Sequence, residues 1–164
     1  AEDARRIWEN ILLAGRDQGI GPAGLAARDT LRLEAGMPLY GHELSLDRDP
    51  ISAGLGFACN LQNREFIGSD ALTRLKNDGP QTVRVGLRPD GKRPAREGAA
   101  ILANDGSQVG ILTSGTASPT LGHPIAMGYV DARLSAVGSK LAVDIRGTTV
   151  NAEIVKLPFY RRAT

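Results

Sequence analysis

The chain has 164 residues, of which 41% are hydrophobic and 23% charged, a balance typical of a globular protein rather than a disordered one. Lys and Arg exceed Asp and Glu by only 20 to 18, so the net charge of +2 gives no reason to expect a nucleic-acid or membrane-surface partner. The single Cys59 excludes an intrachain disulfide, and with only His42 and His123 present no metal site is expected.

The first half of the chain is predicted to be mainly helical, with helices at residues 3–15, 24–36 and about 69–77. In the first of these, Ile7, Trp8 and Ile11 recur at helical spacing, with charged residues on the other side. The stretch between the second and third helices is expected to be irregular, with one short strand as an alternative in the run GLGFACN, residues 54–60.

Beyond residue 80 the hydrophobic period changes from 3.6 to 2, which is typical of strands. Turn-forming residues separate six such runs, at 82–87, 99–104, 108–114, 125–131, 140–146 and 149–156. We therefore predict an α+β chain with two domains, 1–79 and 80–164. The second is expected to be a small antiparallel β-barrel, and the helices of the first to leave apolar faces poorly covered.

Most motifs that carry chemistry are absent, among them phosphate-binding glycine loops and the nucleophile elbow. Arg28, on the second helix, either recognises a carboxylate with its planar fork or pairs with Asp29 at the surface. Arg32, one turn later, is expected to be solvated. Residues 159–162 gather aromatic and basic side chains, which suits either ligand contacts or a frayed end.

Several blocks of the chain resemble a known family. GLAARDTLRLEAGMPLYGHEL, DPISAGLGFA and VGILTSGTASPTLGHPIAMGYV occur in the order found in the aminomethyltransferase (T-protein) of the glycine cleavage system. The likeness runs from about residue 4 onward. Because the family enzyme is about twice as long, the resemblance implies its C-terminal part only. Residues 1–79 would then be the C-terminal portion of the folate-binding α/β domain, and 80–164 the C-terminal β-barrel.

The resemblance also implies an activity. That family takes the aminomethyl group from the lipoyl arm of the H-protein, releases ammonia and passes the one-carbon unit to tetrahydrofolate, the co-substrate. By position in the motifs, Arg28, Tyr160 and Arg161 are implied to bind folate, and Arg84 to be a structural arginine at the join between the domains. The family's pterin-orienting carboxylate lies in the half that this chain lacks. No catalytic residue is therefore expected here, and the chain alone is expected to be inactive.

The resemblance leaves other interpretations open. A similar two-domain unit forms the C-terminal end of folate-dependent dehydrogenases of dimethylglycine and sarcosine. The barrel alone is also compatible with a non-catalytic docking module. A folate-binding protein of iron–sulfur cluster maintenance carries K-G-C-Y-x-G-Q where this chain has NREFIGSD. Because this chain lacks the cysteine of that motif, the sequence argues against membership in the cluster-maintenance family. The expected location is the cytoplasm of a bacterium, or the mitochondrial matrix if the source is eukaryotic.

Overall fold

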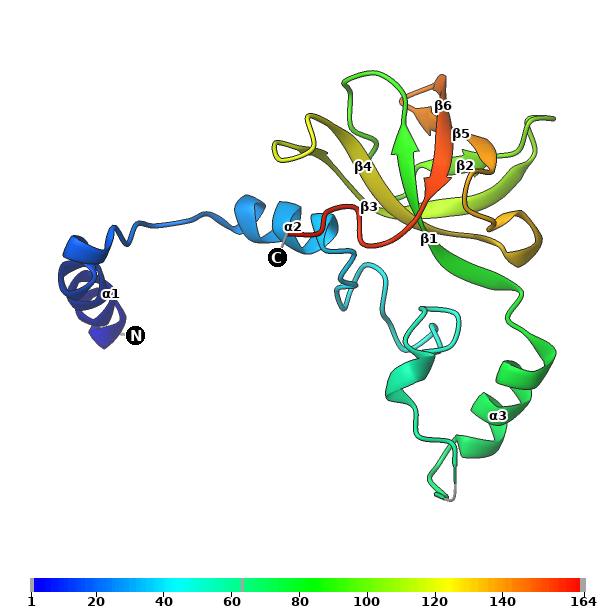
Figure 1. Ribbon diagram of the computed structural model, residues 1–164, viewed down its shortest axis with the longest axis horizontal. Coiled ribbons are helices and arrows are strands. Elements are labelled where there is room, and N and C mark those ends of the chain that lie inside the picture. Colours follow the sequence, from blue (N-terminus) through cyan, green and yellow to red (C-terminus); the bar gives the residue numbers. More distant parts are fainter. Residues whose placement is uncertain (1, 63, 163–164) are drawn as a thin grey trace.

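Six antiparallel strands close into a barrel in the computed structural model, which describes residues 2–62 and 64–162 (Figure 1). The strands are β1 (Thr82–Pro89), β2 (Ala100–Leu102), β3 (Gln108–Ser118), β4 (His123–Asp131), β5 (Lys140–Ile145) and β6 (Thr148–Val155). They pair in the order β1-β4-β3-β2-β5-β6, and β6 pairs with β1. None of these six strands is therefore left at an open edge. The predicted barrel is confirmed.

Three helices precede the barrel, so the predicted α+β class is confirmed as well. They are α1 (Glu2–Ala14), α2 (Leu25–Glu34) and α3 (Ser69–Asp78), and short 3₁₀ turns lie at η1 (Arg16–Gln18), η2 (Gly56–Ala58) and η3 (Ala132–Leu134). Apart from η2, the stretch between α2 and α3 is irregular, as predicted, and the alternative of a short strand at residues 54–60 is wrong because η2 lies there. Within the described part of the chain, no helix has both the length and the apolar character that a membrane crossing requires.

Alternate side chains of each strand fill the inside of the barrel. In β5, Leu141, Val143 and Ile145 point inward and are buried, while the residues between them are more exposed. The same core contains Val85, Leu87, Ile101, Leu112, Val130 and Ile154. A shift of one residue in an alternating strand such as β5 would turn its apolar set toward solvent, so this alternation fixes the register of the pairs.

Strand β4 is buried on both faces, unlike the other strands. Its outward-facing side chains are at most 2% exposed: Ile125, Met127 and Tyr129. Leu33 of α2 packs against this face, and Leu157 and Phe159 of the C-terminal tail pack beside it. A second, smaller core therefore lies outside the barrel, between β4, α2 and the tail.

A glycine in β1 makes room for the tail. A Cβ placed on Gly86 would lie 2.7 Å from Cδ2 of Leu157 and 2.9 Å from Cζ of Phe159, closer than carbon atoms approach without moving. The absence of a side chain at this position therefore lets residues 157–159 lie directly against the strand.

Helix α1 stands apart from the barrel, beyond an extended linker (Figure 1). None of its residues is buried, and Ile7, Trp8 and Ile11 are 53%, 51% and 52% exposed. An apolar helix face normally packs against another element. The expectation that the first region leaves apolar surface uncovered is confirmed for α1.

We expect Gly86→Ala to lower the free energy of unfolding by about 1–3 kcal/mol, because the added methyl group forces Leu157 and Phe159 to move. Urea denaturation measures the loss. Gly21→Ala is the matched control, since an added Cβ there has no neighbour within 4 Å. If the two variants were equally stable, the close seating of the tail on β1 would be contradicted.

Candidate functional site

Helix α2 lies against β3 and β4 and ends in a glycine turn that sends the chain back toward the barrel. The N–H of Gly36 donates to the carbonyl of Leu33 at 2.8 Å, and the N–H of Met37 donates to the carbonyl of Arg32 at 2.8 Å. This pair of bonds is a Schellman motif, and the φ of 65° at Gly36 is the left-handed conformation that the motif requires. The reversal brings Glu43 against the C-terminal half of α2.

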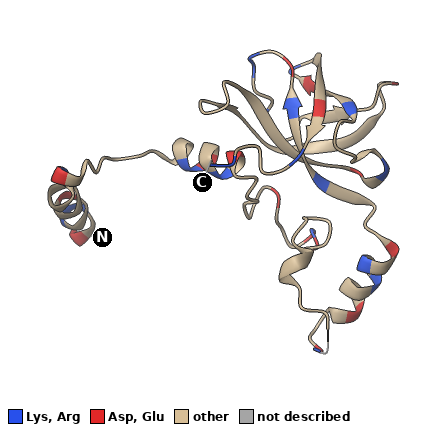
Figure 2. Cartoon of the chain, viewed as in Figure 1, with Lys and Arg blue, Asp and Glu red and all other residues tan. Residues whose placement is uncertain are grey.

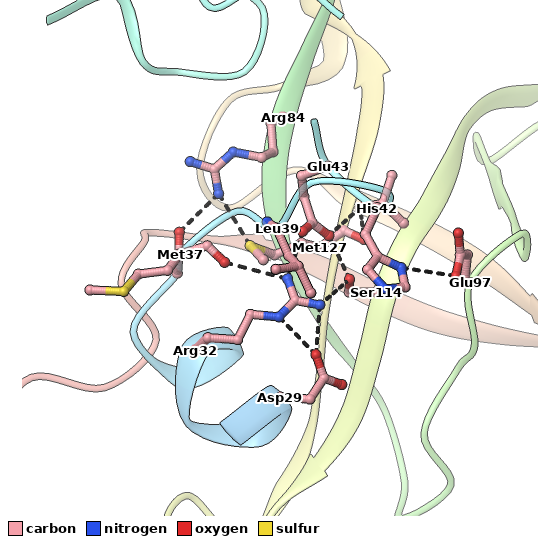
Figure 3. Close-up of polar contacts among 12 residues, drawn as sticks. Asp29, Arg32, Met37, Leu39, His42, Glu43, Arg84, Glu97, Ser114 and Met127 are labelled. Carbon is pink, nitrogen blue, oxygen red and sulfur yellow. Dashed lines mark hydrogen bonds and ion pairs between the residues drawn. The ribbon is translucent and has the colours of Figure 1, made fainter. Parts of the chain in front are cut away.

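A buried ion pair joins α2 to the segment that follows it (Figure 3). Nη1 of Arg32 donates to Oε2 of Glu43 at 2.6 Å, and the two side chains are only 9% and 0% exposed. Arg32 also donates from Nε to Oδ1 of Asp29 at 2.8 Å and from Nη2 to Oγ of Ser114 at 2.7 Å. Each nitrogen of the guanidinium therefore has an acceptor.

Four donors satisfy the carboxylate of Glu43. Oε1 accepts from the hydroxyls of Thr113 at 2.7 Å and Ser114 at 2.6 Å, while Oε2 accepts from Arg32 and from the N–H of Leu39 at 3.0 Å. Burial raises the pKa of Glu43, but the hydrogen bonds from Ser114, Thr113 and Leu39 and the charge of Arg32 together hold the pKa below its ordinary value. The pair is therefore ionised at neutral pH.

The expectation that Arg32 is solvated is wrong. The helical spacing of apolar residues correctly predicted that Arg32 lies on a helix. Its partner Glu43, however, lies 11 residues later, in a stretch without periodicity. A charged residue in an irregular segment is usually exposed, so the pattern gave no reason to bury Glu43. The one available signal was the apolar surroundings of the acid in LYGHEL.

Arg28 lies in the N-terminal half of α2 and is exposed. Asp29, its expected surface partner, accepts from Arg32 instead. Among the described residues Arg28 forms no ion pair and no side-chain hydrogen bond. Its guanidinium is therefore available to a ligand.

The C-terminal tail is attached to the same helix. The N–H of Tyr160 donates to the carbonyl oxygen of Glu34 at 2.9 Å, and the Tyr160 side chain is 43% exposed. Arg28 lies six residues before Glu34, roughly 9 Å along the helix axis. Arg161 follows in the tail and is exposed. The structure thus brings Tyr160 and Arg161 to the helix that carries Arg28, although among the described residues neither side chain bonds to Arg28 itself.

Glu34 is a second buried acid that sequence reasoning missed. Its side chain is 2% exposed and accepts from Oγ of Ser118 at 2.5 Å and from Oγ1 of Thr120 at 3.0 Å. These hydroxyls lie at the end of β3 and in the turn after it. Glu34 therefore links the C-terminal end of α2 to the β3–β4 turn through its side chain, and to the tail through its backbone.

Arg84, expected to be structural, connects β1 to the segments before it (Figure 3). Nε donates to the carbonyl of Ala53 at 2.8 Å, and Nη1 donates to the carbonyl of Gly36 at 3.0 Å. Nη1 also lies 3.2 Å from Sδ of Met127. The contacts span the irregular stretch and the barrel, and the role of Arg84 at the join stays a prediction.

Family profiles match both parts of the chain. The glycine cleavage T-protein C-terminal barrel domain matches residues 83–161, and the GCVT N-terminal domain matches residues 1–63. The chain belongs to the glycine cleavage T-protein family. The resemblance expected from the sequence motifs is thereby confirmed.

Curated relatives extend the match along nearly the whole chain. The aminomethyltransferase of Saccharopolyspora erythraea is 48% identical over 161 residues, which cover 98% of this chain and 44% of the relative. The aminomethyltransferase of Geobacillus kaustophilus is 48% identical, covering 99% of this chain and 45% of the relative. The chain therefore spans less than half the length of the curated relatives that it matches.

A solved structure shows the same fold. The glycine cleavage system aminomethyltransferase T from Bartonella henselae is 36% identical and superposes with a TM-score of 0.88. The match covers 96% of this chain and 44% of that one. The arrangement of helices and barrel is thus shared with a protein more than twice as long.

We expect the free energy of unfolding to fall as the pH drops below about 4.5. The folded-state pKa of Glu43 is lowered from its ordinary value of 4.5, so its stabilising contribution is present above that value and is lost as the pH falls through the folded-state pKa. Urea denaturation at a series of pH values should show a steeper loss in the wild type than in Glu43→Gln.

At pH 7, Glu43→Gln should itself cost about 3 kcal/mol, because it leaves the buried Arg32 with Asp29 as its remaining counter-ion. A Glu43→Gln protein with the stability of the wild type at pH 7 would contradict the importance of this ion pair.

Proposed function

We propose that the chain forms the C-terminal part of a tetrahydrofolate-dependent aminomethyltransferase of the glycine cleavage system. In this reaction the one-carbon unit passes from the aminomethyl-lipoyl arm of the H-protein to tetrahydrofolate, and ammonia is released. The observation that carries the proposal is the 48% identity to an aminomethyltransferase along 98% of the chain. The bacterial relatives support a cytoplasmic location.

Arg28 is the residue that we propose to bind the folate carboxylate. It is exposed, without an ion pair in the described part of the chain, and carried on a helix that the buried Arg32–Glu43 pair holds in place. A planar guanidinium can donate two parallel hydrogen bonds to a carboxylate. A side chain on a rigid element binds with less loss of conformational freedom than one on a mobile loop.

The tail supplies the second part of the proposed site. The half-exposed ring of Tyr160 offers a flat surface and a hydroxyl, both suited to an aromatic ligand such as a pterin or its benzoyl extension. Arg161 adds a second cation. The hydrogen bond from Tyr160 to Glu34 supports the assignment, because it holds the ring near the helix of Arg28.

In a full-length aminomethyltransferase that carries these 164 residues as its C-terminal part, Arg28→Ala should weaken tetrahydrofolate binding roughly 10- to 150-fold. The range corresponds to the about 1.5–3 kcal/mol of a hydrogen bond to a charged group. Arg28→Lys should restore part of the affinity, since an ammonium keeps the charge but loses the fork. Titration at fixed salt measures both.

Arg133→Ala is the control for this experiment, because Arg133 is exposed and paired with Asp131 after β4. Arg32 does not serve, since its removal would leave Glu43 buried without its counter-ion. Unchanged affinity in Arg28→Ala, or an equal loss in Arg133→Ala, would contradict the proposed role.

The 164-residue chain alone should produce no 5,10-methylenetetrahydrofolate from tetrahydrofolate and aminomethyl-lipoyl H-protein. Among the described residues, the proposed site offers binding groups but no positioned acid or base, whose loss typically costs about 10²–10⁴ in rate. The lack of any buried residue in α1 supports the proposal of a partial site. The full-length Saccharopolyspora erythraea relative is the positive control. Product formation by the chain alone would contradict a partial site.

A further inference from the structure

Four cations without acidic partners gather at one end of the barrel, here called the basic end. Lys92, Arg93 and Arg96 belong to the loop between β1 and β2, where Figure 2 shows Lys and Arg in the loop that follows β1. Arg146 belongs to the turn between β5 and β6. All four are exposed, and none forms an ion pair with any residue that the structure describes.

Three other cations of the barrel are paired with acids. Arg88 and Lys140 both contact Glu153, at 2.8 and 3.0 Å, and Arg133 contacts Asp131. The four cations of the basic end lack such a partner among the described residues.

Two neighbouring cavities open at the basic end and share Arg93 and Ile145. One, of about 580 Å³, is lined by three of the four cations: Arg93, Arg96 and Arg146. The other, of about 400 Å³, is lined by Lys92, Arg93 and one acid, Asp90, together with Thr148, Thr149, Val150 and Asn151. The cations are thus spread over adjoining hollows that also offer apolar and hydroxyl-bearing walls.

The acids near the first cavity are already engaged. Glu97 accepts from Nδ1 of the His42 ring at 3.0 Å, and Asp144 accepts from the N–H of Gly147 at 2.6 Å. These contacts tie the two acids to the chain itself. Asp90, which lines the second cavity, also forms no ion pair with these cations. Since none of the three acids contacts a cation of the basic end, the four cations stay available to a ligand.

The backbone at Arg146 gives an independent indication. Its φ is 56°, and it is the one non-glycine residue with a positive φ in the described chain. Arg146 and Gly147 form a two-residue turn between the paired Ile145 and Thr148, with left-handed conformation at both positions. Such turns favour Asn-Gly, so an arginine at the first position strains the backbone where Asn would not. The cationic side chain is thus kept at a cost in stability.

We propose that the basic end binds an acidic polypeptide segment of a partner protein. Carboxylates spaced along an extended chain can meet the cations of both cavities. A single small anion would reach only part of this set. Charged groups of this kind mainly set the rate and specificity of association and make it sensitive to salt. The proposal is independent of the proposed aminomethyl transfer.

Fluorescence anisotropy of a labelled hexaglutamate peptide with the 164-residue chain tests the proposal. We expect saturable binding that weakens as salt rises. Arg146→Asn should weaken it about fivefold, the effect of losing about 1 kcal/mol from one exposed ion pair. Because Asn suits the turn, the same variant should be at least as stable in urea as the wild type, which separates lost binding from lost folding.

Arg133→Gln is the matched control, since it removes an exposed cation elsewhere on the barrel and should leave peptide affinity unchanged. Arg96→Gln is a second variant at the basic end that leaves the turn intact, and it should weaken binding to a similar extent. No saturable binding at low salt, an equal loss in Arg133→Gln, or displacement of the peptide by inorganic phosphate at equal total charge would overturn the proposal.

Discussion

The buried ion pair between Arg32 and Glu43 is the constraint on which the position of α2 depends. Each of these charges loses several kcal/mol of hydration on burial, and this loss is offset only when the partners meet with good geometry. Glu43 also accepts from Thr113 and Ser114 of β3, so the pair is anchored to the barrel. An apolar contact tolerates sliding, whereas moving α2 by one turn would leave two charges buried and unpaired.

This anchoring divides α2 into two parts with different tasks. The C-terminal half is buried through Arg32, Leu33 and Glu34 and carries the contacts to the barrel and tail. The N-terminal half, with Arg28, projects beyond them and is exposed. A ligand-binding side chain is thereby held by interactions several residues away, which leaves its own polar groups unused by the fold.

The elements of the fold could be predicted from the sequence because their signals are local. The period of 3.6 in the first half and of 2 after residue 80 depends on neighbouring residues, and the Asp-Gly and Arg-Gly turns mark the strand ends. The burial of Glu43 could not be predicted in this way, because its donors Thr113 and Ser114 lie about 70 residues away. The burial of Arg32 could not be predicted either, because it depends on Glu43 in an irregular stretch and on the distant Ser114.

The residues of the candidate site, like the burial of Glu43, could not be found from local patterns. No periodicity singled out Arg28, Tyr160 or Arg161 as ligand-binding residues; they were assigned by resemblance to a family. The structure adds the hydrogen bond from Tyr160 to Glu34, a contact across more than 100 residues that no local pattern encodes. The double-sided burial of β4 left a clearer trace, since HPIAMGYV is almost continuously apolar, as expected of a strand covered on both faces.

The seating of the tail also sets the order in which the fold can be completed during translation. Leu157 and Phe159 are synthesised after every residue that they cover, including Ile125 and Met127 on the outer face of β4. Until residues 157–159 leave the ribosome, the barrel strands have been made but this apolar face lacks its cover. Exposed apolar surface of this kind is where nascent chains aggregate or recruit chaperones. The same short segment that leads into the proposed ligand site thus also completes the outer core of the barrel.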